Sequence, residues 1–175
     1  MVRSCLGLLA LVSLALFSSC KEEKKSDDII VEKVVDKVQQ GTEKMANESH
    51  NGNVQWIGGQ SYSYTIKRES SQSLPKVMNH DVEYYDNYIT LTVRRSDGTV
   101  FFEKKFSKSN FSPVLPEDFN ESGVMLGMTY HKTEGNDLYF LVSVGSPDEN
   151  IEEFYYVLLE LNNFGNTSAK KYVSQ

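Results

Sequence analysis

The chain is poor in the residues that most metal and disulfide chemistry requires. Its 175 residues contain two cysteines and three histidines. His50, His80 and His131 each stand apart from any cysteine and form no HExxH or HxH spacing, so the pattern does not indicate a metal site. Cys5 and Cys20 both fall near the start, so no disulfide can form in the remainder of the chain. We expect no cofactor.

The familiar catalytic motifs are also absent. The chain holds no GxSxG elbow, no Walker loop, no paired cysteines and no GxGxxG after an expected strand, which disfavours an enzyme built on those devices. Positive charge is scarce, since 18 basic residues face 24 acidic ones and the formal net charge is -6. No basic run is long, and a phosphate backbone repels an acidic surface, so we expect no nucleic-acid partner.

No hydrophobic run is long enough to cross a bilayer. The apolar stretch from Leu6 to Phe17 has 12 residues, whereas a helix needs about 20 to cross the hydrocarbon. Arg3 precedes this stretch, and two serines follow it directly before Cys20. A basic start, a short apolar segment and a small-residue end form the plan of a secretory signal. The sequence therefore predicts a cleaved signal peptide over residues 1–19.

Two small residues followed by Cys20 resemble the lipobox of bacterial lipoproteins. The resemblance implies that Cys20 is acylated on sulfur and attaches the mature chain durably to a membrane. Lys21, Glu22 and Glu23 resemble the export signal that sends Bacteroidetes-type lipoproteins to the outer face of the outer membrane. A generic solvated tether has the same composition, so an outer-membrane anchor on the cell surface and one on the periplasmic face both remain open.

A polar tether is expected to separate the anchor from the folded part. Residues 20–53 are rich in charged and amide side chains and contain no aromatic residue, so we predict the tether over 20–53 and one domain over 54–175. Ile29–Val38 places five β-branched residues at helical spacing. This short segment is compatible with disorder, with a helix docked on the domain, or with a coiled coil.

The folded part is expected to be all-β. Residues 60–67 alternate, with Tyr62, Tyr64 and Ile66 on one face. Residues 88–106 form the clearest hairpin, because two alternating runs flank an Asp-Gly turn at Asp97. A further strand is expected at 81–85, and two more hairpins at 124–144 and 154–173. Two prolines within 112–119 indicate a loop or a helical turn there.

Together these segments predict an antiparallel meander of about eight strands. Such a meander buries one face either by closing into a barrel or by folding into a two-sheet sandwich, and the pattern does not separate the two. The succession of lipobox, polar tether and aromatic-rich hairpins resembles small single-domain Bacteroidetes-type lipoproteins that are grouped as domains of unknown function. That resemblance covers essentially the whole chain and implies no activity and no site residues.

Aromatic residues are the main candidates for a binding function. The chain has ten tyrosines and nine phenylalanines, and such rings stack on sugars and anchor protein interfaces. The candidate ligand-binding aromatics are Trp56, Tyr62, Tyr64, Tyr84, Tyr88 and Tyr155. We therefore expect a membrane-anchored envelope protein, most simply non-catalytic, that binds another envelope protein or a glycan. Aromatic cross-strand pairs also stabilise sheets without binding anything, which is the structural alternative.

The sequence is also compatible with two other functions. Scattered carboxylates can form the acid and base of a hydrolase acting on an extracellular polymer, and the candidates are Asp81, Glu83, Glu117, Asp118 and Glu121. The acidic loop Ser146–Asn150 has oxygens suited to calcium but lacks the DxDxDG spacing, so we interpret it as a turn. A purely structural or assembly subunit is the third alternative.

Overall fold

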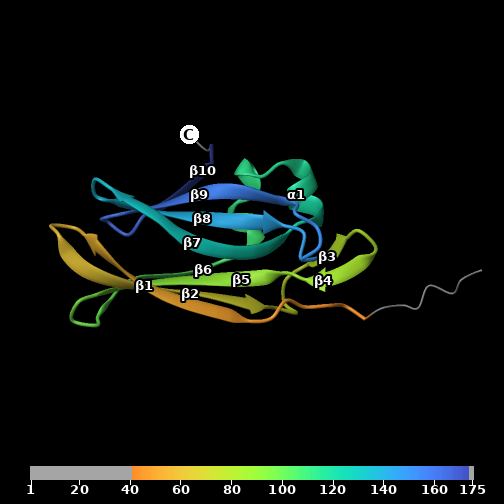
Figure 1. Cartoon of the computed structure of the whole chain (residues 1–175), viewed down its shortest axis with the longest axis horizontal. Helices are drawn as coiled ribbons and strands as arrows, with labels where there is room; N and C mark the ends of the chain where they lie inside the picture. The colour runs from red at the N-terminus through yellow and green to blue at the C-terminus, as the bar shows by residue number, and fades with distance from the viewer. Residues whose placement is uncertain (1–40, 174–175) are drawn as a thin grey trace, which may run out of the picture. The chain divides into compact units, whose positions relative to one another are not determined.

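The computed structural model describes residues 41–173, which form two antiparallel four-stranded sheets stacked face to face, with a short hairpin beside them (Figure 1). The strands of this part are β1 (Glu48–Trp56), β2 (Gln60–Ser70), β3 (Lys76–Asn79), β4 (Val82–Tyr85), β5 (Asn87–Arg95), β6 (Val100–Phe106), β7 (Val124–Glu134), β8 (Asp137–Gly145), β9 (Phe154–Asn162) and β10 (Thr167–Lys171). Its helical segments are η1 (Lys108–Asn110), η2 (Ser112–Val114) and α1 (Glu117–Ser122).

The N-terminal sheet has the strand order β1-β2-β5-β6. The Asp-Gly turn between β5 and β6 forms as expected, because Gly98 takes a φ of 83° that favours glycine. Asp97 closes the same turn by accepting a hydrogen bond from the backbone amide of Thr99 at 2.9 Å. Ile89, Leu91 and Val93 alternate along β5 and are fully buried, so the predicted inward face is confirmed.

The C-terminal sheet is a meander in the order β10-β9-β8-β7. Two of its three turns reverse at Gly135 and Gly165, both with positive φ. Leu138, Phe140 and Val142 of β8 have no exposed surface, because their side chains face the N-terminal sheet. Burying each such side chain stabilises the fold by about 1.5–3 kcal/mol, so the layer between the sheets is the main source of stability.

One end of the sandwich is covered by the helical segments and by the β3–β4 hairpin (Figure 1). Phe111, between η1 and η2, is buried and stacks on Phe106 with ring centroids 5.7 Å apart. Asn79 of β3 donates to the carbonyl of Ser122 at 2.8 Å and so ties the hairpin to α1. The predicted loop or helical turn at 112–119 is therefore confirmed as short helical turns that close the core.

The sandwich is thus the alternative that the structure supports, since the two four-stranded sheets of residues 41–173 do not join into a closed barrel. The expected number of about eight strands was too low, because β1 and β3 were not predicted. β1 begins at Glu48, so the sheet includes residues that composition assigned to the tether. The predicted signal peptide, Cys20, the Lys21–Glu23 signal and the Ile29–Val38 segment lie outside the described residues.

Candidate binding face

Two of the six predicted aromatics are core residues. Trp56 is 2% exposed and Tyr62 is 5% exposed, and their rings meet edge to face at 5.1 Å. The indole Nε1 of Trp56 donates to the carbonyl oxygen of Asn136 at 3.0 Å, which links β1 to the β7–β8 turn. These rings join the two sheets and present no face to solvent, so their assignment to a binding surface is corrected.

Tyr64 and Tyr155 also point between the sheets. Tyr64 stacks on Tyr130 with ring centroids 5.6 Å apart, and burial raises the pKa of its phenol. Tyr155 packs against Phe119 of α1 at 5.7 Å. Both rings are half-buried against the core cluster. Their role is to fill the space between the layers.

The remaining two predicted aromatics lie apart from each other. Tyr84 is in the β3–β4 hairpin, where desolvation and, to a lesser extent, the Glu43 carboxylate raise the pKa of its hydroxyl. Tyr88 is on the outer face of the N-terminal sheet, with the Lys105 Nζ 4.1 Å from its ring centroid. The six predicted residues therefore do not form one surface.

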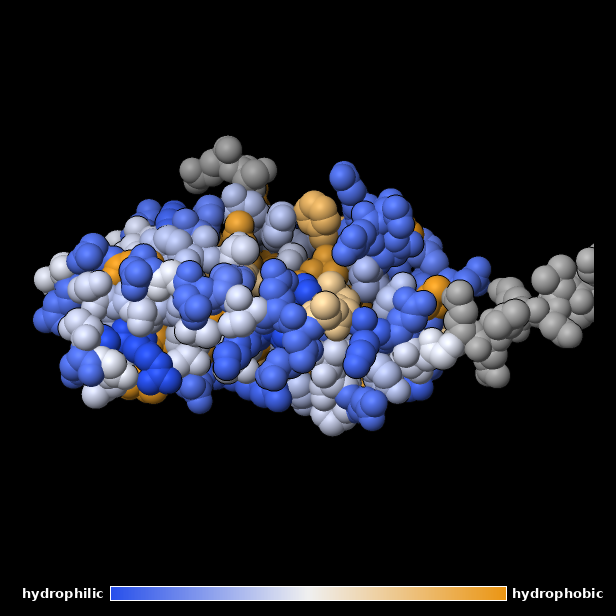
Figure 2. All heavy atoms as spheres, turned by 60° about the horizontal axis from the view of Figure 1, so that its bottom comes forward, coloured by the Kyte–Doolittle hydropathy of each residue, from blue (hydrophilic) through white to orange (hydrophobic). Residues whose placement is uncertain are grey.

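The outer face of the N-terminal sheet is polar. Figure 2 turns this side toward the reader and shows mainly hydrophilic residues with small, scattered apolar spots. The side chains in its shallow central depression are Ser49, Asn51, Thr65, Lys67, Glu69, Thr90, Thr92, Arg94 and Glu103. This face is solvated and carries no row of aromatic rings.

The outer face of the C-terminal sheet carries a connected row of aromatic rings. Phe154 and Tyr156 alternate along β9, and their ring centroids are 5.2 Å apart. Tyr156 meets Tyr172 at 6.2 Å, and Tyr172 meets His131 at 5.5 Å. Phe154 is 49% exposed and Tyr156 is 39% exposed. We call Phe154, Tyr156, Tyr172 and His131 the aromatic row.

Small residues lie beside the aromatic row. Tyr156 pairs with Ser143 on β8, and Ser143 pairs with Gly127 on β7. A Cβ added at Gly127 would meet only the Ser143 hydroxyl, 3.7 Å away, so the space above this glycine is open. Since neither neighbour covers it, the Tyr156 ring is accessible from the side of the sheet as well as from above.

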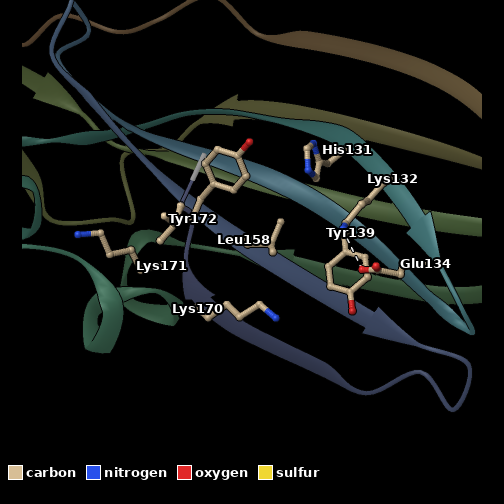
Figure 3. Close-up of a pocket in the computed structure, with 9 residues that line it drawn as sticks. His131, Lys132, Glu134, Tyr139, Leu158, Lys170, Lys171 and Tyr172 are labelled. Atoms are coloured by element: carbon tan, nitrogen blue, oxygen red, sulfur yellow. Dashed lines mark ion pairs between the residues drawn. The ribbon is translucent and has the colours of Figure 1, made fainter. Parts of the chain in front are cut away.

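A hollow of about 470 Å³ adjoins the aromatic row (Figure 3). Leu158 lies between Tyr172 and Tyr139 in this view, and the polar groups of His131, Lys132, Glu134 and Lys170 surround them. The volume falls within the range of about 300–1,000 Å³ that is typical of small-molecule sites. The hollow therefore combines an apolar floor with a polar rim.

The charges at the rim are paired with one another. The Lys132 Nζ lies 2.8 Å from a Glu134 carboxylate oxygen, and the Lys170 Nζ lies 3.9 Å from one of Glu160. The hydrogen bond from Lys132 lowers the pKa of Glu134. Both lysines also lie over the ring of Tyr139, at 5.4 Å and 5.6 Å from its centroid. The rim thus offers hydrogen-bond donors and acceptors side by side.

A family model described as a domain of unknown function (DUF4738) matches residues 28–169. The chain belongs to the DUF4738 family. No curated protein matches it. The match supports the expected small domain of unknown function, and it begins within the segment predicted as tether.

A second pocket of the DUF4738 domain contains a buried carboxylate. Asp86 is 4% exposed, and one of its oxygens accepts the backbone amides of Asn87 and Met125 at 2.7 Å and 2.8 Å. Desolvation raises the pKa of Asp86. The nearby Lys108 donates to the carbonyl of Gly123, and desolvation lowers the pKa of this lysine. This pocket, of about 230 Å³, is also lined by Glu121, one of the predicted carboxylates.

The other predicted carboxylates lie elsewhere. Glu83 is held by Lys76 at 2.7 Å and also accepts from Thr42, and these bonds lower its pKa. In the acidic loop, Asp148 accepts a hydrogen bond from the Asn150 backbone amide at 2.9 Å, which is a contact typical of a turn. Glu117 and Asp118 are exposed in the first turn of α1. Across residues 41–173, no group of three or more potential ligands is arranged to hold a metal ion.

Three residues of this face were missed by sequence reasoning: Tyr139, Phe154 and Tyr172. For Tyr156 a signal existed, since Tyr155 and Tyr156 must point to opposite faces of β9. The sequence identified Tyr155 as the binding member of that pair, whereas Tyr156 faces outward.

Within the described residues there is no helix of the length and hydropathy needed to cross a membrane.

Proposed function

We propose that this chain is a lipid-anchored envelope protein whose DUF4738 domain binds a glycan on the outer face of the C-terminal sheet. The observation that carries the proposal is the aromatic row beside a hollow with an apolar floor and a polar rim. Sugar rings have apolar C–H faces and hydroxyl edges, so they match rings and paired polar groups at the same time.

The anchor part of the proposal rests on the sequence. A signal-like segment ends at Cys20, and the mature chain then has no second cysteine. Palmitate labelling of cells that express the full chain should mark the wild type and not Cys20→Ala. Equal labelling of the two would contradict the anchor.

The location is tested separately. A protease added to intact cells should digest the wild type if Lys21, Glu22 and Glu23 direct surface export, and a variant with alanine at all three should be protected. Lysed cells are the control, in which both proteins should be digested. Protection of both proteins on intact cells would place the domain in the periplasm.

Glycan binding is tested with the full chain in detergent on an array of envelope and extracellular oligosaccharides. Tyr156→Ala should weaken binding at least about tenfold, which corresponds to about 1.4 kcal/mol. The matched control is Phe164→Ala, because Phe164 is 82% exposed in the β9–β10 turn and outside the aromatic row. Binding to an envelope protein and to no glycan would assign the face to protein docking instead.

The pocket at Asp86 supports a second candidate function, a carboxylate-dependent hydrolase. A buried carboxyl with a raised pKa suits a general acid, and Glu121 lines the same pocket. Release of reducing ends from a polymer by the wild type, lost in Asp86→Asn and in Glu121→Gln, would establish it. Release that survives in either variant would exclude this pair as the catalytic groups.

A further inference from the structure

The charge balance of the rim bears on which glycan the face takes. The domain is acidic, and two of the three lysines that line the hollow are each matched by a carboxylate, Lys132 by Glu134 and Lys170 by Glu160. Lys171 does not alter this balance, because its Nζ lies 5.7 Å from the Tyr155 ring centroid and points away from the hollow in Figure 3. The two lysine ammonium groups that face the hollow are therefore both matched by a carboxylate.

The lysine–glutamate pairs at the rim are suited to binding the hydroxyl groups of a sugar. A hydroxyl donates one hydrogen bond and accepts others, so a sugar can accept from the Lys132 ammonium while it donates to the Glu134 carboxylate. A carboxylate or sulfate can only accept, and it would lie beside the charges of Glu134 and Glu160. An acidic sugar must therefore disrupt a lysine–glutamate pair that a neutral sugar can leave in place.

The aromatic row extends beyond the hollow. Successive ring contacts connect His131 and Tyr172, which adjoin the hollow, to Tyr156 and then to Phe154. The exposure of Tyr156 and Phe154 leaves their rings free for contacts with a ligand that continues past the hollow. A single sugar would leave these two rings unused.

We infer that the face binds an uncharged oligosaccharide chain, with one unit in the hollow between Tyr139 and Tyr172 and further units along Tyr156 and Phe154. This inference rests on the proposed glycan function and adds the charge and the length of the ligand. The charge follows from the paired rim, and the length follows from the row.

The test measures binding of the full chain in detergent to two sets of probes. Neutral probes are glucose, mannose, xylose and the hexamer of each; acidic probes are the hexamers of galacturonate and of sulfated galactose. A neutral hexamer should bind at least tenfold more tightly than either acidic hexamer. Phe154→Ala should weaken the hexamer at least threefold and leave the binding of its monosaccharide unit unchanged.

A charge variant separates the inference from the function on which it rests. Glu134→Gln releases the Lys132 ammonium, so it should raise affinity for the acidic hexamers and lower it for the neutral one. Glu117→Gln, exposed on α1, is the control and should change neither. Preference of the wild type for an acidic hexamer, or equal binding of monomer and hexamer, overturns the inference and leaves glycan binding intact. Failure to bind any probe in either set overturns the inference, and failure to bind any member of the oligosaccharide array overturns the glycan function as well.

Discussion

Trp56 provides a sharp test of the division between core and binding face. Its ring is buried against Tyr62 and lies edge-on to Phe101 with centroids 5.0 Å apart, and its Nε1 donates to the Asn136 carbonyl. If these contacts define its role, replacing Trp56 must lower the free energy of unfolding and leave glycan binding unchanged once the protein is folded.

The expected loss of unfolding free energy follows from the contacts that each Trp56 variant removes. Trp56→Ala deletes a fully packed aromatic side chain, which costs about 3–5 kcal/mol. Trp56→Phe keeps one ring in the core and loses the hydrogen bond to Asn136, whose net value is about 0.5–1.5 kcal/mol, together with part of the apolar contact. We expect the phenylalanine variant to lose roughly 1–3 kcal/mol in total.

The assay is urea unfolding followed by far-ultraviolet circular dichroism, because Trp56 is the single tryptophan and its fluorescence is lost in both variants. With a slope of about 1–3 kcal/mol per molar urea, the midpoint of Trp56→Ala should fall by roughly 1–5 M. Tyr156→Ala should show the opposite behaviour, with normal stability and weakened binding. A Trp56→Phe variant that keeps wild-type stability but loses glycan affinity would refute the placement of this ring.

Three further outcomes follow from the structure. Gly52→Ala should cost about 1–3 kcal/mol in urea unfolding, because the Tyr64 ring covers this glycine and the added Cβ would collide with it. Gly98→Ala should cost about 1 kcal/mol by the same measurement, since the turn holds this residue at a φ of 83°. Burial raises the pKa of Asp86, so the folded state binds the Asp86 proton more tightly than the unfolded chain does. The contribution of Asp86 to the free energy of unfolding should therefore fall as the pH rises from 3.8, the ordinary pKa of the carboxyl group, through the raised pKa of the folded state. The difference in unfolding free energy between the wild type and Asp86→Asn, measured across this window, should therefore shift in favour of the asparagine variant with rising pH; a difference that is constant with pH would contradict this account.

The strands that were predicted correctly carry a local signal on their own residues. In β5, three aliphatic side chains alternate with polar ones directly before Asp97 and Gly98, so periodicity and turn chemistry agree. β1 gave no such signal, because its inward positions include His50 and Gly52, and only Val54 and Trp56 are apolar and fully buried. Its place in the sheet depends on pairing with β2, which composition does not reveal.

The aromatic row was hard to predict for a different reason. Phe154–Leu159 is apolar without interruption, so the sequence shows a strand but not which alternate residues face the core. The register with β8 decides this, since Tyr155 lies opposite the buried Val144 and Tyr156 lies opposite Ser143. A shift of one residue would exchange the faces.

The rim of the hollow depends on an irregularity in β7 that no local pattern indicates. With regular alternation after the outward Thr129, His131 would face outward and Lys132 would face the core. The register instead shifts between Tyr130 and Lys132 and places Lys132 opposite the outward Tyr139, so both His131 and Lys132 line the hollow. The ammonium that pairs with Glu134 thus reaches the rim through the pairing of β7 with β8. A candidate site made in this way becomes visible only when the strands are aligned with each other.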